Sequence, residues 1–406
     1  MKNFRHTIYM ALFLMTFSAC HKEPYEQNDN SIDVQFPYSS YIFFNASQAT
    51  KGEMIFDDLK ERTFAVTAYK YSGEWGVVSK GTCLPNVFWN FPVTYESGAH
   101  VYDATTNEYN TYTDGDGNKL KLIPWEDGQR YTFYAHYPYD SSNTNPKVSS
   151  KTTQHGEPYL DFTLPATSDA MFYLMTAGLQ DENNSVDNYV SLRMYHRLAA
   201  FDVYVSNNIQ SIKVDGVDKV VSVIVKNVSV TFDNLMYSAA SFWMNRTYKA
   251  NSSDKAGVRA LTQYGANGAE KSFVILSDSD SDSEKKMQTI QNGKRDNVSG
   301  VNNRSLLIIP QTKDGSDKYL KGSLMFDCEF VDQDGNPISV PLLKDDNTTV
   351  QVSSLTNQSM SFNVNKNVDA GYTYYLELAF VNGVITLRVQ SAPTWDENIN
   401  SKYEFN

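Results

Sequence analysis

Cysteine is scarce in this sequence. Only three occur among 406 residues, and the two that lie well inside the chain, Cys83 and Cys328, are far apart. This excludes a dense disulfide framework and the closely paired cysteines of a zinc or redox site. We interpret both as small buried hydrophobic side chains, with a long-range disulfide between them as the alternative.

Basic residues are also in deficit. The chain has 35 lysine and arginine residues against 47 aspartate and glutamate residues, which gives a formal net charge of −12. Nucleic-acid-binding domains concentrate positive charge, because they must neutralise phosphates. The composition therefore argues against a nucleic-acid partner.

Catalytic motifs are missing as well. The sequence has no G-x-S-x-G elbow, no Walker loop and no dinucleotide-binding glycine pattern. Its histidines form no i, i+4 pair, and His136 and His196 lie inside strand-like runs, which is typical of structural histidines. We predict no enzyme, no cofactor and no metal site. Because paired carboxylates leave no mark in a sequence, a glycoside hydrolase stays open as a minor alternative.

The first twenty residues have the layout of a bacterial export signal. A basic start is followed by an apolar stretch over residues 8–17, which is too short to span a bilayer. Small residues then precede Cys20, an arrangement that resembles a lipobox, in which the thiol is lipidated and acyl chains such as palmitate hold the protein on a membrane. We predict a signal peptide over 1–19, lipidation at Cys20 and a polar tether over 20–31. An ordinary signal peptide is the alternative.

The rest of the chain is patterned for strands. Apolar residues alternate with period two over 32–36, 64–68, 131–135 and 201–205, and no stretch has a sustained helical period. Turn signals rich in Asp, Asn and Gly separate the runs. The clearest is Asn382-Gly383, which lies between two alternating segments and predicts a β-hairpin with a type I′ turn. The fold class is therefore all-β, built as sandwiches.

Length and composition divide the body into two domains. A chain of this length exceeds a single comfortable core, and the polar stretch at 181–188 marks a boundary. We predict an N-terminal β-sandwich over 32–188 and a C-terminal β-sandwich over 189–406. Within the second domain, the polar stretches 251–270 and 277–304 are predicted as long surface loops.

Three phrases of the sequence carry a resemblance to a known family. They are TFAVTAYKYSGEW at Thr63–Trp75, WEDGQRYTFYAHYPY at Trp125–Tyr139 and VSLRMYHRLAAFDVYV at Val190–Val205. They resemble the fimbrillin family, the subunits of type V pili, and a Tyr-rich hairpin followed by Trp395 is similar to that family's closing pattern. The resemblance implies two tandem β-sandwich domains of transthyretin-like, Greek-key type after a lipoprotein signal peptide. It also implies assembly by exchange of β-strands between subunits.

The family resemblance also implies a maturation step. In the family a trypsin-like protease cuts after a basic residue ahead of the strand that corresponds to residues 63–69 here. Lys51-Gly52 lies in a polar, small-residue stretch suited to proteolysis and is the candidate cut site, with a solvated loop lysine as the alternative. The donor segment would be the carboxyl-terminal strand, where Tyr403 and Phe405 alternate in a short tail, which favours a tip or lipidated anchor over a stalk position.

The leading hypothesis is a structural and adhesive component of a surface pilus. Such a fimbrium subunit, a tip, stalk or anchor, would contact other subunits by strand exchange, the outer membrane through lipid on Cys20, and a host protein or glycan receptor at the cell surface. The alternative is a surface glycan-binding lipoprotein of a nutrient-uptake system. Trp75, Trp89 and Trp243 would serve its sugar stacking if exposed, although core packing is the default for tryptophan.

Overall fold

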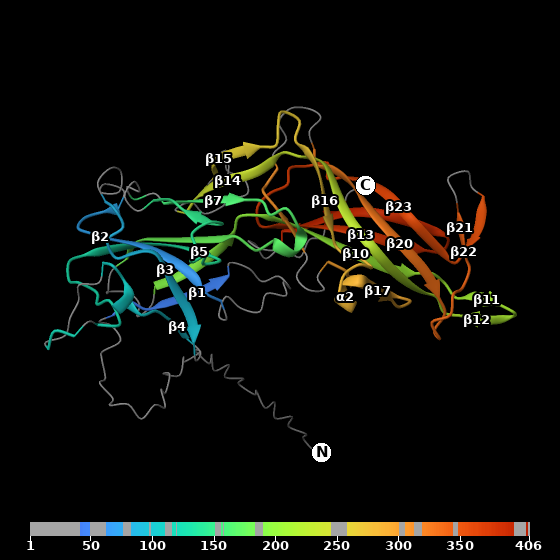
Figure 1. Ribbon diagram of the computed structural model, residues 1–406, viewed down its shortest axis with the longest axis horizontal. Helices are drawn as coiled ribbons and strands as arrows, with labels where there is room; N and C mark the ends of the chain where they lie inside the picture. Colours follow the sequence, from blue (N-terminus) through green and yellow to red (C-terminus); the bar gives the residue numbers. More distant parts are fainter. Residues whose placement is uncertain are drawn as a thin grey trace, which may run out of the picture. The chain divides into compact units, whose positions relative to one another are not determined.

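Alternating apolar residues form strands throughout the chain, as the sequence pattern predicts (Figure 1). The structure is a computed structural model that describes residues 41–48, 62–75, 83–96, 99–109, 116–118, 120–150, 156, 158–182, 190–244, 258–299, 305–311, 319–343, 348–393 and 403–404. These residues all belong to one compact unit that begins at Tyr38. The all-β class is confirmed.

Seven of the described strands before residue 197 close into a barrel. Their order around the ring is β1-β4-β3-β2-β5-β8-β9. The strands are β1 (Phe44–Gln48), β2 (Phe64–Tyr71), β3 (Phe88–Glu96), β4 (Ala99–Val101), β5 (Arg130–Tyr137), β8 (Met175–Glu182) and β9 (Val190–His196). The barrel interior is filled by one apolar cluster that includes Phe64, Phe88 and Phe133.

Strands β2 and β5 are buried on both faces. Phe64 and Phe133 point into the barrel cluster, whereas Tyr69 and Tyr134 belong to a second cluster, which also contains Leu160. A four-stranded sheet in the order β15-β14-β7-β6 supplies Leu160 and covers this outer face. Its strands are β6 (Lys147–Val148), β7 (Tyr159–Thr163), β14 (Tyr237–Trp243) and β15 (Val258–Gln263). Burial on both faces explains why these two strands read as almost continuous apolar and aromatic runs.

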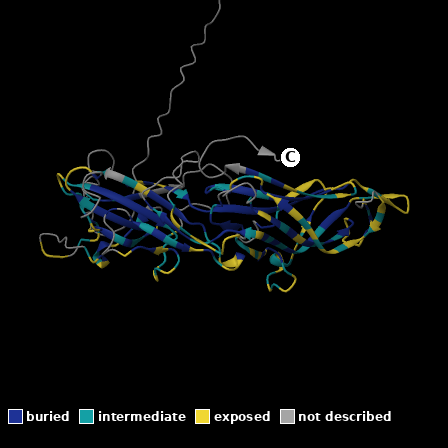
Figure 2. Cartoon of the chain, turned by 90° about the horizontal axis from the view of Figure 1, so that it is seen from above, coloured by how far each residue is buried: buried dark blue, intermediate teal, exposed yellow. Residues whose placement is uncertain are grey.

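Most of the remaining strands form two sheets that face each other. One has the order β18-β10-β24-β25-β26, with β19 also paired to β10, and the other has the order β16-β13-β20-β23, with β17 also paired to β13. Ring contacts between Phe201 and Phe232 at 5.1 Å and between Phe330 and Phe380 at 6.0 Å join the two sheets. Figure 2 shows buried residues running along the strands and exposed residues gathering at their ends. This part is a β-sandwich.

The bounds of these strands and of the small elements complete the description. The strands are β10 (Ala199–Asn208), β13 (Ser222–Leu235), β16 (Ala269–Val274), β17 (Met287–Ile290), β18 (Lys294–Asn297), β19 (Leu306–Ile308), β20 (Lys321–Val331), β23 (Ser354–Asn363), β24 (Tyr372–Val381), β25 (Val384–Pro393) and β26 (Tyr403–Glu404). Two hairpins stand apart from the large sheets, β11 (Ile212–Val214) with β12 (Val217–Lys219) and β21 (Val340–Leu343) with β22 (Thr349–Val352). The helical turns are η3 (Ala104–Thr106), η4 (Ser168–Ala170) and α2 (Ser283–Lys286).

The hairpin predicted around Asn382-Gly383 is confirmed. Strands β24 and β25 pair in register from Tyr372 opposite Pro393 to Val381 opposite Val384. The two turn residues have φ angles of 31° and 87°. Positive φ at both central positions is the signature of a type I′ turn, which matches the twist of the flanking strands.

Strand pairs cross the predicted domain boundary. Strand β7 precedes it but pairs with β14, and β9 follows it but pairs with β1 and β8. The described parts of the two polar stretches also differ from the predicted long loops, because 251–270 contains β15 and 277–304 contains α2, β17 and β18. These short strands are held by neighbours rather than by their own apolar content, so composition did not reveal them. The division at residue 188, the transthyretin type and the Greek-key order stay predictions.

Candidate functional site

Strand β1 closes the barrel. All five residues of β1 lie parallel to β9, from Phe44 opposite Val190 to Gln48 opposite Met194. On its other side, in the register of the described residues, β1 meets β4 at a single position, Phe44 opposite His100. Residues far apart in sequence thus form this seam, and most of its backbone pairing is to β9.

Side chains at the start of β1 enter the barrel core. Ile42 is 0% exposed and Phe44 is 2% exposed. The ring of Phe44 lies 6.1 Å from that of Phe88, 5.6 Å from that of Tyr102 and 5.7 Å from that of Phe133, measured between centroids. Full burial of such a side chain contributes roughly 1.5–3 kcal/mol. β1 therefore supplies part of the barrel core as well as an edge.

A buried tyrosine holds the entry to β1. The Tyr102 hydroxyl donates to the carbonyl oxygen of Ile42 at 2.8 Å and accepts from the backbone N–H of Ile123 at 3.1 Å. Ile42 donates its own N–H to the carbonyl oxygen of Ile123 at 2.9 Å. Burial raises the pKa of Tyr102, so the hydroxyl stays protonated. If β1 left, this hydroxyl and the facing edge of β9 would lose their partners.

The residues predicted as sites from the sequence lie outside the described residues. This applies to Cys20 and to Lys51 and Gly52, which the sequence places three and four positions after β1 ends at Gln48. Strand β2 starts at Phe64. Lipidation and cleavage stay predictions.

The histidines and the remaining cysteines take structural positions. His136 and His196 are 1% and 3% exposed, and burial lowers the pKa of each to about 3. Cys83 and Cys328 are both free thiols. Cys328 is fully buried, as predicted, whereas Cys83 is half-buried and packs against the second apolar cluster. Both histidines are neutral across physiological pH.

The tryptophans named as sugar-stacking candidates separate in the structure. Trp75 is 3% exposed and donates from Nε1 to the Tyr134 hydroxyl at 2.9 Å. Trp89 and Trp243 are half-buried. Trp89 donates from Nε1 to the carbonyl oxygen of Ser149 at 3.1 Å. Trp75 is therefore a core residue, and Trp243 keeps an accessible ring on the outward face of β14.

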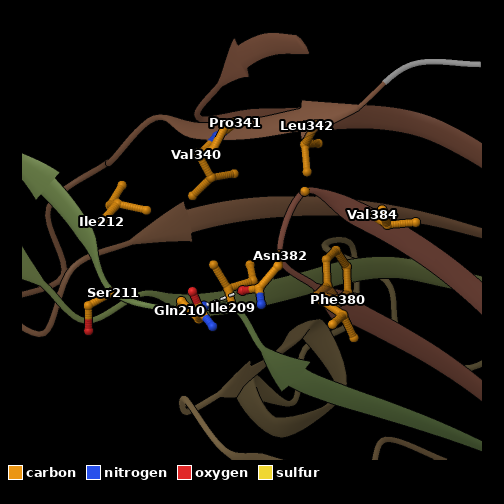
Figure 3. A pocket seen from close by; sticks show the side chains of 12 residues that line it. Ile209, Gln210, Ser211, Ile212, Val340, Pro341, Leu342, Phe380, Asn382 and Val384 are labelled. Carbon is orange, nitrogen blue, oxygen red and sulfur yellow. Dashed lines mark hydrogen bonds between the residues drawn. The ribbon is translucent and has the colours of Figure 1, made fainter. Parts of the chain in front are cut away.

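A groove of about 250 Å³ lies beside the Asn382-Gly383 turn (Figure 3). Its lining is mainly aliphatic and includes Ile212, Val340 and Leu342. The turn is fixed there because Asn382 accepts at Oδ1 from the N–H of Gln210 at 2.7 Å. Among the described residues, no ionisable side chain lines this groove, so these residues offer no general acid or base.

The described residues hold neither a metal-binding cluster nor a membrane-spanning helix. Within these ranges, no group of three or more His, Cys, Asp or Glu side chains is arranged to hold a metal ion. Within the same ranges, no helix is both long and apolar enough to cross a membrane.

A match to a family model identifies the family of this chain. A family model described as fimbrillin-like matches residues 89–393. The chain belongs to the fimbrillin-like family. No curated protein matches the chain. The family points to a fimbrial or adhesive, non-enzymatic protein of the cell surface.

Solved structures agree with this fold. A fimbrial protein from Bacteroides vulgatus shares 19% identity, covers 88% of this fimbrillin-like chain and 99% of its own, and has a TM-score of 0.52. Two proteins described as cell adhesion proteins follow. The one from Bacteroides uniformis has 15% identity, coverage of 88% and 99% and a TM-score of 0.38. The one from Bacteroides ovatus has 12% identity, coverage of 89% and 98% and a TM-score of 0.39. The first supports the fold alone, and the other two carry no argument.

Proposed function

We propose that this fimbrillin-like chain is a structural and adhesive pilus component that is exported as a lipoprotein on Cys20 and assembled by exchange of β1. The observation that carries the proposal is the barrel seam. A single short strand from one end of the chain closes the barrel and places Phe44 in its core. A strand of this kind can be replaced by an extended segment from another subunit.

Removal of β1 would leave a groove with a defined chemistry. Its floor would be the rings of Phe88, Tyr102 and Phe133, which now surround Phe44. One wall would be the edge of β9, with the backbone groups that now pair with β1. An entering strand would restore the backbone pairing and fill the apolar floor, so binding would repeat the last step of folding.

The position of the candidate cut fits such an exchange. Lys51 lies after the end of β1 at Gln48 and before the start of β2 at Phe64. A cut there separates β1 from the rest of the barrel, while β2 keeps its pairing to β3 and β5. The cut would therefore convert a covalently tethered strand into a replaceable one.

The carboxyl-terminal segment is suited to leave its own subunit. Strand β26 pairs with β25 through Tyr403 opposite Ser391 and Glu404 opposite Gln390. It lies at the edge of its sheet. Two residues on a sheet edge form a weak attachment, so the tail can detach and act as a donor for the next subunit.

Limited trypsin treatment of the mature chain tests the cut. We expect a new amino terminus at Gly52 by mass spectrometry, followed by a ladder of oligomers that resists dissociation in cold detergent. Lys51→Ala should abolish both, and Lys60→Ala is the matched control that should leave both unchanged. Formation of the same ladder by Lys51→Ala and the parent chain would show that strand release at this lysine is not the route of assembly.

The donor is tested separately. A chain lacking residues 395–406 should still be cut at Lys51 but should cap a growing ladder instead of extending it. Adding a synthetic peptide of residues 395–406 to cut monomers should block the ladder by occupying the groove. If the truncated chain polymerises as fast as the full chain, the carboxyl-terminal segment is not the donor.

A further inference from the structure

The outward face of the β15-β14-β7-β6 sheet differs chemically from its inward face. Leu160 of β7 and Phe242 of β14 pack into the core. Register places Trp243 opposite Tyr159 and Ser241 opposite Asp161, at the positions that alternate with those core residues. Because strand side chains alternate between faces, these four residues share the outer surface. Figure 1 shows β7, β14 and β15 side by side.

A β-bulge in β15 aims an arginine over this surface. Ser241 pairs with Ala260 and Phe242 pairs with Val258, so Arg259 is the extra residue between them. Bulges turn side chains out of the regular alternation and are common next to functional sites. Arg259 is exposed, and its guanidinium carbon lies 4.2 Å from the ring centroid of Tyr159 and 5.6 Å from that of Trp243.

The rings of Tyr159 and Trp243 hold the Arg259 guanidinium in place. Tyr159 and Trp243 meet edge to face, with centroids 5.8 Å apart and ring planes at 86°. A cation held against such rings gains roughly 0.5–1 kcal/mol at an exposed site. The planar donor fork of Arg259 is thus pre-oriented and loses less freedom when it binds an anion.

A second stacked arginine, Arg295, has a carboxylate partner, whereas Arg259 does not have one among the described residues. Arg295 lies 3.8 Å from the ring centroid of Tyr204, and its Nε donates to Glu377 Oε1 at 3.1 Å. Among the described residues, Arg259 makes no such ion pair, although Asp161 lies on the same face. Asp161 instead accepts at Oδ1 from the Ser241 hydroxyl. In a chain of net charge −12, a stacked arginine with no ion-pair partner among the described residues is a candidate anion site.

We propose that this face, made of Tyr159, Asp161, Trp243 and Arg259, binds a saccharide that carries a carboxylate. Arg259 takes the sugar carboxylate through two parallel N–H donors. The exposed part of the Trp243 ring packs against the apolar face of the sugar ring. The second carboxylate oxygen of Asp161 accepts a sugar hydroxyl.

The placement of these groups favours a saccharide over a peptide. An extended peptide binds a sheet by adding to an open edge, where backbone groups are unpaired. Here the aromatic and acceptor groups lie on the face of β7 and β14, two strands that are each paired on both sides, and Arg259 of the edge strand β15 turns over that face. The inference rests on the adhesive part of the proposed function and gives it a ligand class, but it does not depend on strand exchange.

The test uses the uncut mature chain, with Cys20→Ser for solubility, and three probes: sialyllactose, its neutral parent lactose, and a tetraglutamate peptide. Calorimetry should detect sialyllactose binding and little binding of the other two. Arg259→Gln should weaken sialyllactose binding about tenfold to a hundredfold, as expected for loss of a charge-assisted pair. The matched control Arg295→Gln should leave it unchanged.

Three results with the probes would overturn the inference. They are no binding of sialyllactose, equal binding of lactose, and equal binding of tetraglutamate. Equal loss in both arginine variants would also overturn it, because that would show a long-range charge effect. Circular dichroism checks that each variant is folded. Since monomeric, uncut protein is used, none of these results bears on polymerisation, so failure here and failure of the assembly proposal are distinguishable.

Discussion

The two buried histidines make the fold sensitive to mild acid. His136 and His196 have a pKa of about 3 in the folded chain because burial penalises the charged ring. An unfolded histidine has a pKa of about 6.5. The unfolded chain therefore binds more protons than the folded chain between these values. Stability is fully present above pH 6.5 and is lost as the pH falls toward 3.

The magnitude follows from the same two pKa values. Between pH 7 and pH 5, each histidine should lower the free energy of unfolding by about 2 kcal/mol. Backbone N–H donors of Thr144 and Asn145 also lower the pKa of Asp140. The stability that this carboxylate contributes is lost only when the pH falls into the usual aspartate range. Burial raises the pKa of Asp202, and its protonation opposes the trend. A substitution is therefore needed to isolate the histidine effect.

Urea unfolding followed by tryptophan fluorescence at pH 7, 6 and 5 provides the measurement. His136→Phe keeps an apolar ring in the buried position and removes the titration, so the drop between pH 7 and pH 5 should shrink by about 2 kcal/mol. His21→Gln, in the predicted tether, is the control and should leave the drop unchanged. An equal drop in His136→Phe and the parent chain would refute the reasoning, because it would place the acid sensitivity elsewhere.

Three further predictions concern the core. Phe44→Ala should destabilise the barrel by about 3–5 kcal/mol and speed release of β1 after trypsin, as followed by gel filtration; an unchanged release rate would contradict the assigned seam. A Cβ on Gly322 would lie 2.1 Å from the Thr231 carbonyl oxygen, so Gly322→Ala should lower the free energy of unfolding by at least about 1–3 kcal/mol in urea titration. Cys83 should react with iodoacetamide before Cys328, whose pKa is raised by burial to about 12, and equal rates by mass spectrometry would contradict the burial.

Two features of this fold could be predicted from short stretches of sequence, namely the closing hairpin and the burial of His136. The type I′ hairpin follows from Asn382-Gly383 and its alternating flanks, and needs no information from elsewhere in the chain. The burial of His136 follows from its place inside an apolar run. The burial of Tyr69 and Tyr134 is harder to predict from the sequence, because a strand buried on both faces loses its period-two signal.

Long-range pairing was beyond the sequence pattern. The parallel register of β1 on β9 joins Phe44 to Val190, and no local propensity encodes that choice. The outward turn of Arg259 depends on one extra residue in β15, and a bulge leaves no distinct mark in a polar stretch. Sequence reasoning therefore named Trp243 as a stacking candidate without finding the arginine and the carboxylate beside it.

The packing and pairing of β1 in the barrel determine which side chains and which backbone edge a replacement strand must provide. Ile42, just before β1, and Phe44, its first residue, are two positions apart and both buried, so this segment places large side chains in the barrel at alternate positions. The carboxyl-terminal tail offers the same spacing in Tyr403 and Phe405. Because the described pairing of β1 is mostly to β9, a donor needs to match one edge rather than two. Under the proposed exchange, a short tail with two alternate aromatic residues supplies the backbone edge and the side chains that pairing with β9 requires.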